Sequence, residues 1–366
     1  MRILHLISSP SAGGAEIYVK DLAKEMVRLG HQPYIGFLNR SGDIGRNEDF
    51  ERRFLGELEV AGVPYFVVGY ECRRNPILGA LRVRRFCAAH GIEIYHSHLH
   101  YALIFGALLR VPHVHTHHNI VPDSWRIMYR LFNQLVDSYI GISEVCAEAL
   151  SQFSGRAVTE IFNAVDPSKL ERANPANSCS GDRLECISVG RIQAQKNLAL
   201  LVEAVRLLPA EIRDSVHVSI AGEGPPADVS ALRLAIDRAG LNGTITLLGN
   251  RHDVPELLAR SQLFVMSSAW EGLPISLLEA SVTGLPFIAT DVGGCREIAA
   301  KCGNGIIVPP GDARAMASAI EGLVRDRAKL RQIAENAQAN SGYFEIERAA
   351  REHLTLYSSL TSVSPE

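Results

Sequence analysis

The sequence lacks the features that mark membrane-spanning, disulfide-linked and nucleic-acid-binding proteins. No apolar run reaches the roughly 18 to 20 residues that cross a bilayer, and we expect no signal peptide. The 7 cysteines are odd in number and include no C-x-x-C pair, so we expect neither a disulfide framework nor a zinc knuckle. A net charge of −3 offers no positive field to a nucleic acid. These absences predict a globular protein of the reducing cytoplasm.

Two motifs that accompany nucleotide chemistry in other enzymes are also missing. The small-residue loop reads Ala-Gly-Gly-Ala at residues 12 to 15 instead of G-x-G-x-x-G, and no acidic residue follows at the usual distance, which disfavours a nicotinamide enzyme. No Asp-x-Asp pair is present to hold Mg²⁺ or Mn²⁺. Any chemistry on a phosphate group would therefore have to draw its positive charge from side chains.

Strand and helix patterns alternate along the chain. Residues 2–7 predict a buried strand, residues 16–29 an amphipathic helix and residues 32–38 a second strand, which together make a βαβ unit of a parallel sheet. The other predicted strands cover residues 64–68, 92–96, 114–116, 139–142, 184–189, 216–221, 245–248, 263–266, 287–290 and 305–308.

The length of 366 residues favours two domains over one. We expect two Rossmann-like, doubly wound α/β domains that face each other across a cleft, with ligands at the carboxyl ends of the strands. The predicted boundaries are an N-terminal domain over residues 1–167, a Pro-, Asn- and Ser-rich linker over 168–182, a C-terminal domain over 183–341 and a final helical segment over 342–366.

Two glutamates in the second half predict a nucleotide-sugar site. A helix is expected to begin near Pro274 and to end at Gly284, so Glu271 lies just before its start. The start of a helix offers unpaired N–H groups to a diphosphate, whereas a neighbouring carboxylate is suited to accept hydrogen bonds from sugar hydroxyls. Glu279 lies more than one turn inside the helix and leans back toward its start, within reach of a ribose.

Two cations follow the predicted strand that ends at Gly190. Arg191 and Lys196 lie in the loop GRIQAQKN, at the edge where a parallel sheet presents ligands. They are suited to stabilise the charge that develops on a nucleoside diphosphate leaving group. Gly13 and Gly14 would let the backbone approach the same phosphates, although a plain turn explains this pair almost as well.

These residues resemble the signature of glycosyltransferase family four, the retaining enzymes of GT-B architecture, in which a Glu, seven residues and a second Glu precede a Gly-Gly turn. Further matches fall in family order over nearly the whole chain: Gly13-Gly14-Ala15-Glu16, His118, Asn163-Ala164-Val165-Asp166, Gly190-Arg191 with Lys196, Ala221-Gly222-Glu223-Gly224-Pro225, and Gly293-Gly294 with Glu297. The resemblance implies a last helix that crosses back onto the first domain.

The resemblance also implies individual roles. Glu271 would contact the donor sugar and Glu279 the ribose, while His118 would contact sugar hydroxyls or the anomeric region through its ring or main chain. The residues expected to act in catalysis are His118, Arg191, Lys196 and Glu271. Those expected to bind the donor are Gly13, Gly14, Arg191, Lys196, Glu271, Gly272, Leu273, Ile275 and Glu279.

The implied reaction moves a sugar from a UDP- or GDP-sugar to a hydroxyl of a glycan or lipid-linked acceptor, with the anomeric configuration kept. The nucleotide sugar is a substrate, so we expect no cofactor and no metal. Two alternatives use the same fold: a nucleotide-sugar isomerase or hydrolase, and a non-catalytic sugar-nucleotide-binding protein. The intact Arg191, Lys196, Glu271 and Glu279 disfavour the second of these.

Histidines are concentrated in the first half, where 10 of the 13 precede residue 119. Two trios alternate with other residues, which would place each trio on one strand face: His96, His98 and His100, and His113, His115 and His117. We favour a polar cleft wall over a metal site because neither a carboxylate nor a cysteine is interleaved.

An arginine-rich segment covers residues 73–86, with Ile77, Leu78, Leu81 and Phe86 among its apolar residues. It predicts either a basic amphipathic helix that contacts anionic lipid at the inner face of the membrane, or an ordinary packed helix with arginines on its wet face. Both interpretations stay open at this stage.

Overall fold

A computed structural model describes residues 1–45, 47–118, 126–171, 173 and 183–362. The chain forms two compact units, of which unit 1 contains Met1–Ala164 with Ile346–Glu366 and unit 2 contains Val165–Glu345. The sequence predicts boundaries after residues 167 and 341, whereas the contacts divide the chain after Ala164 and Glu345. Most of the predicted linker, residues 172 and 174–182, lies outside the described residues.

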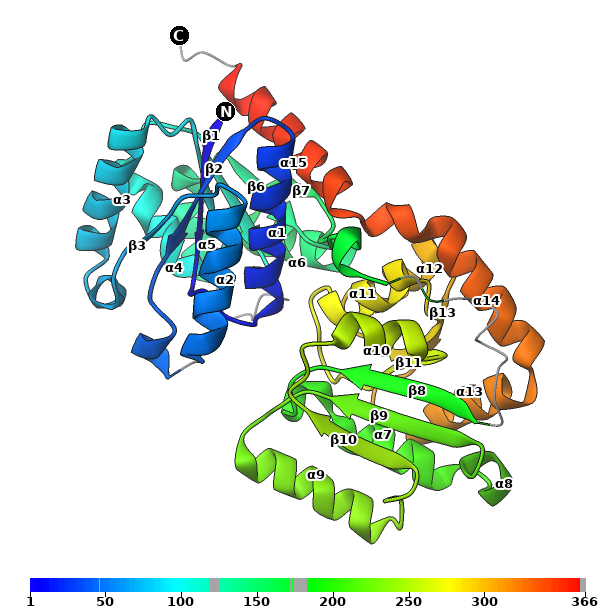
Figure 1. Ribbon diagram of the computed structural model, residues 1–366. Helices are drawn as coiled ribbons and strands as arrows, with labels where there is room; N and C mark the ends of the chain where they lie inside the picture. The colour runs from blue at the N-terminus through cyan, green and yellow to red at the C-terminus, as the bar shows by residue number, and fades with distance from the viewer. Residues whose placement is uncertain (46, 119–125, 172, 174–182, 363–366) are drawn as a thin grey trace. The chain divides into compact units, whose positions relative to one another are not determined.

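Unit 1 is built on a seven-stranded parallel sheet with the order β3-β2-β1-β4-β5-β6-β7 (Figure 1). Its strands are β1 (Arg2–Ile7), β2 (Gln32–Phe37), β3 (Tyr65–Val67), β4 (Ile94–Ser97), β5 (His113–His117), β6 (Ser138–Gly141) and β7 (Val158–Glu160). Six of these strands are predicted by the sequence. The seventh, β7, is a three-residue edge strand that is mostly exposed and therefore carries no alternating pattern.

Helices cover both faces of this sheet: α1 (Gly14–Arg28), α2 (Glu48–Val60), α3 (Pro76–His90), α4 (His100–Leu103), α5 (Arg126–Phe132), α6 (Glu144–Ser154) and α15 (Ile346–Thr361). Leu4 and Leu6 of β1 share a core cluster with Val83 and Cys87 of α3. The last helix, α15, packs beside α1 and buries His353 and Tyr357 in unit 1. The predicted return of the final helix to the first domain is therefore confirmed.

Unit 2 contains a six-stranded parallel sheet with the order β10-β9-β8-β11-β12-β13. Its strands are β8 (Leu184–Val189), β9 (Val216–Ala221), β10 (Ile245–Gly249), β11 (Leu263–Met266), β12 (Phe287–Thr290) and β13 (Gly305–Val308). Its helices are α7 (Leu198–Leu207), α8 (Ala210–Arg213), α9 (Pro226–Arg238), α10 (Val254–Arg260), α11 (Ile275–Thr283), α12 (Cys295–Cys302), α13 (Ala313–Arg325) and α14 (Arg327–Asn340). All six strands that the sequence predicts for this half are present.

Both sheets reverse their strand order at one point. In unit 1 the chain moves outward from β1 to β2 and β3, and then returns to place β4 on the other side of β1. In unit 2, β8 and β11 flank the equivalent point. The connecting loops diverge there and leave room for a ligand at the carboxyl ends of the strands. Among the described residues, no helix is long and apolar enough to cross a membrane.

Candidate active site

The residues predicted to bind or transform a donor belong to both units. Gly13, Gly14 and His118 lie in unit 1, and the remaining predicted residues, from Arg191 to Glu279, lie in unit 2. In unit 2 they follow two adjacent strands, because Arg191 and Lys196 come after β8 and Glu271 comes after β11. The site of unit 2 therefore forms at the point where strand order reverses.

Backbone and side-chain hydrogen bonds join the loops after β8 and β11. The amide of Ala269 donates to the carbonyl of Gln195 at 2.8 Å, and the hydroxyl of Ser267 donates to the carbonyl of Lys196 at 3.0 Å. These bonds hold the two loops in a fixed relation. They explain how residues of the loop after β8 can contact a carboxylate in the loop after β11.

Glu271 is the centre of this arrangement and is only 7% exposed. Its Oε1 pairs with Nζ of Lys196 at 2.7 Å and accepts the hydroxyl of Ser268 at 2.7 Å. Its Oε2 accepts Nε2 of Gln195 at 3.2 Å. Sequence reasoning missed Gln195 and Ser268, although both lie within a few residues of predicted site residues. The structure thus brings Glu271, predicted to bind the sugar, into direct contact with Lys196, predicted to bind the diphosphate.

The helix that follows is α11, which begins at Ile275 with Pro274 at its N-cap and ends at Gly284 in a left-handed conformation. Both ends agree with the sequence prediction. Proline has no side-chain acceptor, and no side chain caps the first turn. A helix start of this kind is suited to bind an anionic group. Glu279 lies in the second turn and is partly buried. Leu273 is 5% exposed, so a donor would meet its main chain more readily than its side chain.

The Gly293-Gly294 turn packs against the backbone that carries Glu271. The amide of Gly294 donates to the carbonyl of Gly272 at 2.8 Å. Gly293 has φ +52°, and a Cβ atom there would lie 2.3 Å from the carbonyl oxygen of Gly272 and 2.4 Å from that of Glu271. Only glycine fits this approach. Cys295, next in sequence, is buried, and burial together with the nearby Glu271 carboxylate raises the pKa of its thiol.

In unit 1, Gly13 is the N-cap of α1 and Gly14 is its first residue. A Cβ atom on Gly13 would lie 2.0 Å from Oε2 of Glu16, so the missing side chain makes room for that carboxylate. Oε1 of Glu16 accepts the hydroxyl of Ser8, which follows β1. This loop follows β1, which lies beside β4 at the point where the strand order reverses.

His118 follows β5 and belongs to a buried cluster of imidazoles. Nε2 of His118 is hydrogen-bonded to Nδ1 of His98 at 2.9 Å, and Nε2 of His98 to Nδ1 of His5 at 3.0 Å. His96 joins the last helix through Nδ1 and the hydroxyl of Tyr357 at 2.6 Å. Burial and the neighbouring imidazoles lower the pKa of His118 to about 3, so its ring is neutral at pH 7.

The second histidine trio lies on the opposite face of the sheet. Ser97 alternates with His96 along β4, so the two side chains point to opposite sides of the pleat. The hydroxyl of Ser97 bonds Nε2 of His113 at 2.7 Å and Nδ1 of His115 at 2.8 Å. The trio of residues 113, 115 and 117 shares one face, as predicted.

Two predictions about the histidines are wrong. His100 lies at the start of α4, outside the strand that would align it with His96 and His98. His96 and His115 are fully buried within unit 1 and form no exposed wall, because helices cover both faces of the sheet. Both side chains instead make hydrogen bonds inside unit 1. Burial lowers the pKa of both well below the ordinary value.

One group of described residues has the composition of a metal site. Ring nitrogens of His5, His96 and His98 lie within 4.8 Å of one another, and all three residues are buried. Nearby imidazole nitrogens can bind a transition metal. Against this, His96 already bonds Tyr357 and Thr116, and the group contains neither a carboxylate nor a cysteine to balance the charge of a cation.

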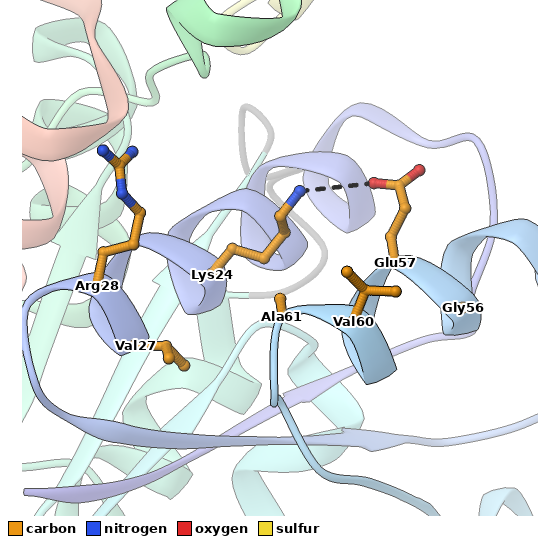
Figure 2. A pocket seen from close by; sticks show the side chains of 7 residues that line it. All are labelled: Lys24, Val27, Arg28, Gly56, Glu57, Val60 and Ala61. Carbon is orange, nitrogen blue, oxygen red and sulfur yellow. Dashed lines mark ion pairs between the residues drawn. The ribbon is translucent and has the colours of Figure 1, made fainter.

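A surface pocket in unit 1 contains none of the predicted site residues (Figure 2). It lies between the second half of α1 and α2, and its lining consists of Lys24, Val27, Arg28, Gly56, Glu57, Val60 and Ala61. Nζ of Lys24 approaches Oε2 of Glu57 at 3.8 Å across it. It is open to solvent, and its charged lining residues are Lys24, Arg28 and Glu57.

Comparison with known proteins identifies the family. Residues 12–169 match the model described as Glycosyltransferase Family 4, and residues 171–340 match the one described as Glycosyl transferases group 1. The chain belongs to this glycosyltransferase family. Its fold agrees: HepE of Anabaena in complex with UDP superposes with a TM-score of 0.83 at 24% identity, over 98% of this chain and 100% of that one. The predicted GT-B fold, two Rossmann-like domains, is confirmed.

Two bacterial relatives are named as sugar transferases. The lipopolysaccharide core biosynthesis mannosyltransferase LpsB of Rhizobium meliloti (strain 1021) is 34% identical over 176 residues, which cover 47% of this chain and 50% of LpsB. The UDP-Gal:alpha-D-GlcNAc-diphosphoundecaprenol alpha-1,3-galactosyltransferase of Escherichia coli is 31% identical over 197 residues, 50% of this chain and 49% of that enzyme. The chain thus spans about half the length of these relatives.

Replacing Gly293 by alanine should destabilise unit 2 and distort the site. The new Cβ meets two backbone oxygens that cannot rotate away, so we expect a loss of about 2 to 3 kcal/mol of stability, read as a lower thermal midpoint. Gly311→Ala is the matched control, because Gly311 has φ +76° and nothing within 4 Å of its Cβ position. Equal losses in the two variants would show that only the positive φ matters and that the contact with Glu271 and Gly272 is unimportant.

Proposed function

We propose that this chain is a retaining glycosyltransferase that moves a sugar from a UDP- or GDP-sugar to an acceptor hydroxyl. The observation that carries the proposal is the position of Glu271, held by Lys196 at the carboxyl ends of β8 and β11 and followed directly by the uncapped start of α11. A sugar would meet Glu271, and the diphosphate would meet Lys196 and the start of α11. Glu279, in the second turn of α11, would meet the ribose. The complexes of HepE with UDP and with UDP-glucose support a nucleotide-sugar donor.

The contacts of Glu271 and Lys196 leave capacity for a ligand. An ammonium group has three N–H donors, and one of those on Lys196 is used by Glu271, so the others can reach phosphate oxygens. A carboxylate has about four acceptor positions. Glu271 fills two on Oε1 and one on Oε2, which leaves Oε2 able to accept a sugar hydroxyl.

The reaction then needs no protein nucleophile. The acceptor oxygen attacks the anomeric carbon on the face from which the diphosphate leaves, the bond from that carbon to the diphosphate oxygen breaks, and the leaving oxygen takes the acceptor proton. Lys196, the exposed Arg191 and the first turn of α11 stabilise the charge that grows on the diphosphate. Attack and departure on one face keep the anomeric configuration.

The acceptor is proposed to be a glycan or a lipid-linked sugar in polysaccharide, glycolipid or other glycoconjugate biosynthesis. This rests on the relatives, which include a lipopolysaccharide core mannosyltransferase and an enzyme named for a diphosphoundecaprenol acceptor. A lipid-linked acceptor is held in a membrane, so we propose that the protein acts in the cytoplasm, with access to the inner face of that membrane.

Substitution of the two glutamates tests the proposal. Glu279→Ala should weaken free nucleoside diphosphate and intact donor alike, by about 1.5 to 3 kcal/mol in calorimetry, because a charged hydrogen bond to the ribose is lost. Glu271→Ala should leave the affinity for nucleoside diphosphate nearly unchanged and abolish most sugar transfer. Glu203→Ala, on the exposed face of α7, is the control and should behave as wild type. Fast consumption of donor without acceptor would instead favour a hydrolase or isomerase.

Turnover should not need a divalent metal. The positive charge for the leaving group comes from Lys196, Arg191 and the start of α11, so treatment with EDTA should change the rate by less than about twofold, or roughly 0.5 kcal/mol of barrier. Loss of activity that Mn²⁺ or Zn²⁺ restores would contradict the assignment of these cations. The residues to replace next would then be His5, His96 and His98, since His115 and His117 lie on the other face of the sheet.

Peripheral contact with a membrane is proposed for α3. Ile77 and Leu81, one turn apart, are 70% and 49% exposed, and Arg84 and Arg85 are exposed beside them. The other two apolar residues of the predicted amphipathic face pack inward, and Phe86 stacks on Phe66 at 3.9 Å between ring centroids. The exposed apolar surface is thus narrower than the sequence indicates, but basic residues still flank it.

Vesicle sedimentation tests this contact. The protein should pellet with vesicles of mixed phosphatidylglycerol and phosphatidylcholine more than with phosphatidylcholine alone, because arginines are attracted to anionic headgroups. Ile77→Ser with Leu81→Ser should lower the bound fraction severalfold. The control is Val60→Ser. Val60 is an apolar residue of α2 that is 92% exposed, but it does not lie on α3 beside Arg84 and Arg85. Equal binding by all three proteins would rule out α3 as the contact.

A further inference from the structure

Gln195 contacts three successive residues of the loop after β11. Its main-chain carbonyl accepts the amide of Ala269 at 2.8 Å. Its side-chain Nε2 lies 3.1 Å from the carbonyl oxygen of Trp270 and 3.2 Å from Oε2 of Glu271. Its side-chain oxygen accepts Nε2 of Gln193 at 3.0 Å. All of these residues belong to unit 2, so every one of these contacts lies within a single unit.

The surroundings permit one orientation of the Gln195 amide. A carbonyl oxygen and a carboxylate oxygen only accept hydrogen bonds, so both must face the NH2 group of the amide and not its oxygen. That group has two N–H donors, and the carbonyl of Trp270 and the carboxylate of Glu271 accept one each. The amide oxygen is then directed to Gln193, whose own NH2 group donates to it. Both ends of the Gln195 amide are thus matched to their partners.

Lys196 and Ser268 hold the Glu271 carboxylate at only one of its oxygens. Nζ of Lys196 and the hydroxyl of Ser268 both bond Oε1, each at 2.7 Å. Two bonds to one atom fix that atom, but they leave Oε2 able to swing about it as the side-chain torsions change. The contact of Gln195 with Oε2 supplies a second point and so fixes the plane of the carboxylate. Because the same amide bonds the carbonyl of Trp270, that plane is tied to the main chain.

We propose that Gln195 is a positioning residue, which holds the Glu271 carboxylate so that Oε2 presents its remaining acceptor position to the sugar of the donor. The proposal rests on the function proposed above, in which Glu271 accepts a sugar hydroxyl. Gln195 is neutral and adds no charge at the diphosphate, so it acts on the sugar end of the donor through Glu271. Lys196, the next residue, acts at the diphosphate end. Changes at position 195 should therefore affect the sugar and spare the nucleotide.

Calorimetry on the full-length protein separates the two ends of the donor. The probes are UDP and UDP-glucose, or GDP and GDP-mannose if the wild-type protein binds that pair more tightly. Gln195→Met keeps the length of the side chain and removes both N–H groups. We expect the Kd of the nucleotide sugar to rise about fivefold to tenfold and that of the free nucleotide to change by less than about twofold. Gln193→Met is the matched control, because it leaves both N–H bonds of Gln195 intact and should bind both probes as the wild type does.

Gln195→Glu adds a dependence on pH that a change of shape alone would not produce. The new carboxylate replaces a nitrogen that lies 3.2 Å from Oε2 of Glu271, and two carboxylates so close repel each other when both are ionised. At about pH 8 we expect this variant to bind the nucleotide sugar more weakly than Gln195→Met does. At about pH 6 the pair shares one proton, whose O–H replaces the lost N–H, so the affinity for the nucleotide sugar relative to the free nucleotide should recover severalfold. Lys196 and Cys295 also face Glu271, but all the variants share them, so a difference between variants arises at position 195.

The hydrogen bonds of Gln195 are also measured without any nucleotide. Side-chain amide ¹H–¹⁵N spectra show the NH2 group of each glutamine, and Gln195→Met identifies the signals of Gln195. We expect its two protons to exchange with water at least about tenfold more slowly than those of the exposed Gln32, because both are hydrogen-bonded. Glu271→Ala removes one of the two acceptors and should abolish this protection.

The outcomes distinguish this proposal from the function on which it rests. Equal losses of affinity for nucleotide sugar and free nucleotide in Gln195→Met overturn it, because Gln195 would then only shape the loop that carries Lys196. Unprotected N–H groups in the wild type overturn it as well. A protein with protected N–H groups that binds none of the nucleotide probes overturns the proposed function and leaves the hold of Gln195 on Glu271 standing. If Gln195→Met does not fold, the comparison of Gln195→Glu at the two pH values decides, and the absence of recovery counts against the proposal.

Discussion

The reversal of strand order in each parallel sheet is the constraint on which both sets of site residues depend. A parallel sheet directs the carboxyl ends of all its strands to one edge, and loops diverge where the order reverses. In unit 2 this brings the loop after β8 to the loop after β11, and so Lys196 to Glu271. In unit 1 it sets β1 beside β4, with His5 and His96 paired in register.

The ion pair of Lys196 and Glu271 shows how a charged site is kept in place before any ligand arrives. The two side chains are 16% and 7% exposed, so both have lost much of their hydration. Ser268 and Gln195 supply further hydrogen bonds to the carboxylate, which offsets part of that cost. Because the two residues come from different loops, their ion pair also fixes the spacing between the side chain proposed to bind the sugar and the one proposed to bind the diphosphate.

Unit 1 differs from unit 2 because the strands of its sheet carry buried histidines at positions where apolar side chains are usual. The imidazoles stay neutral because burial disfavours their charged forms, and they then satisfy one another by hydrogen bonds. One of these bonds joins His96 to Tyr357 of α15, so the last helix is attached through a polar contact as well as through apolar packing. The core of this unit is therefore both a packing surface and a hydrogen-bonded network.

Much of the fold follows from local pattern. Alternating strands and helices predict two parallel-sheet domains, and twelve of the thirteen strands are recognisable from their apolar runs, which are most deeply buried in the central strands such as β1 and β11. The helix after Glu271 begins and ends where proline and glycine require. The three-residue β7 carries no such pattern, since it lies at an edge and is mostly exposed.

By itself the sequence determined the elements, the two-domain class and the residue types of a nucleotide-sugar site. Only the tertiary structure decided which side chains meet. It joined Gln195 and Ser268 to Glu271, placed the two histidine trios on opposite faces, and linked His118 through His98 to His5. The physical reason is that all of these contacts except the local one between Ser268 and Glu271 depend on strand order or on the pleat of the sheet. Both arise from long-range pairing of backbone groups, which leaves no local trace in the residues that it brings together.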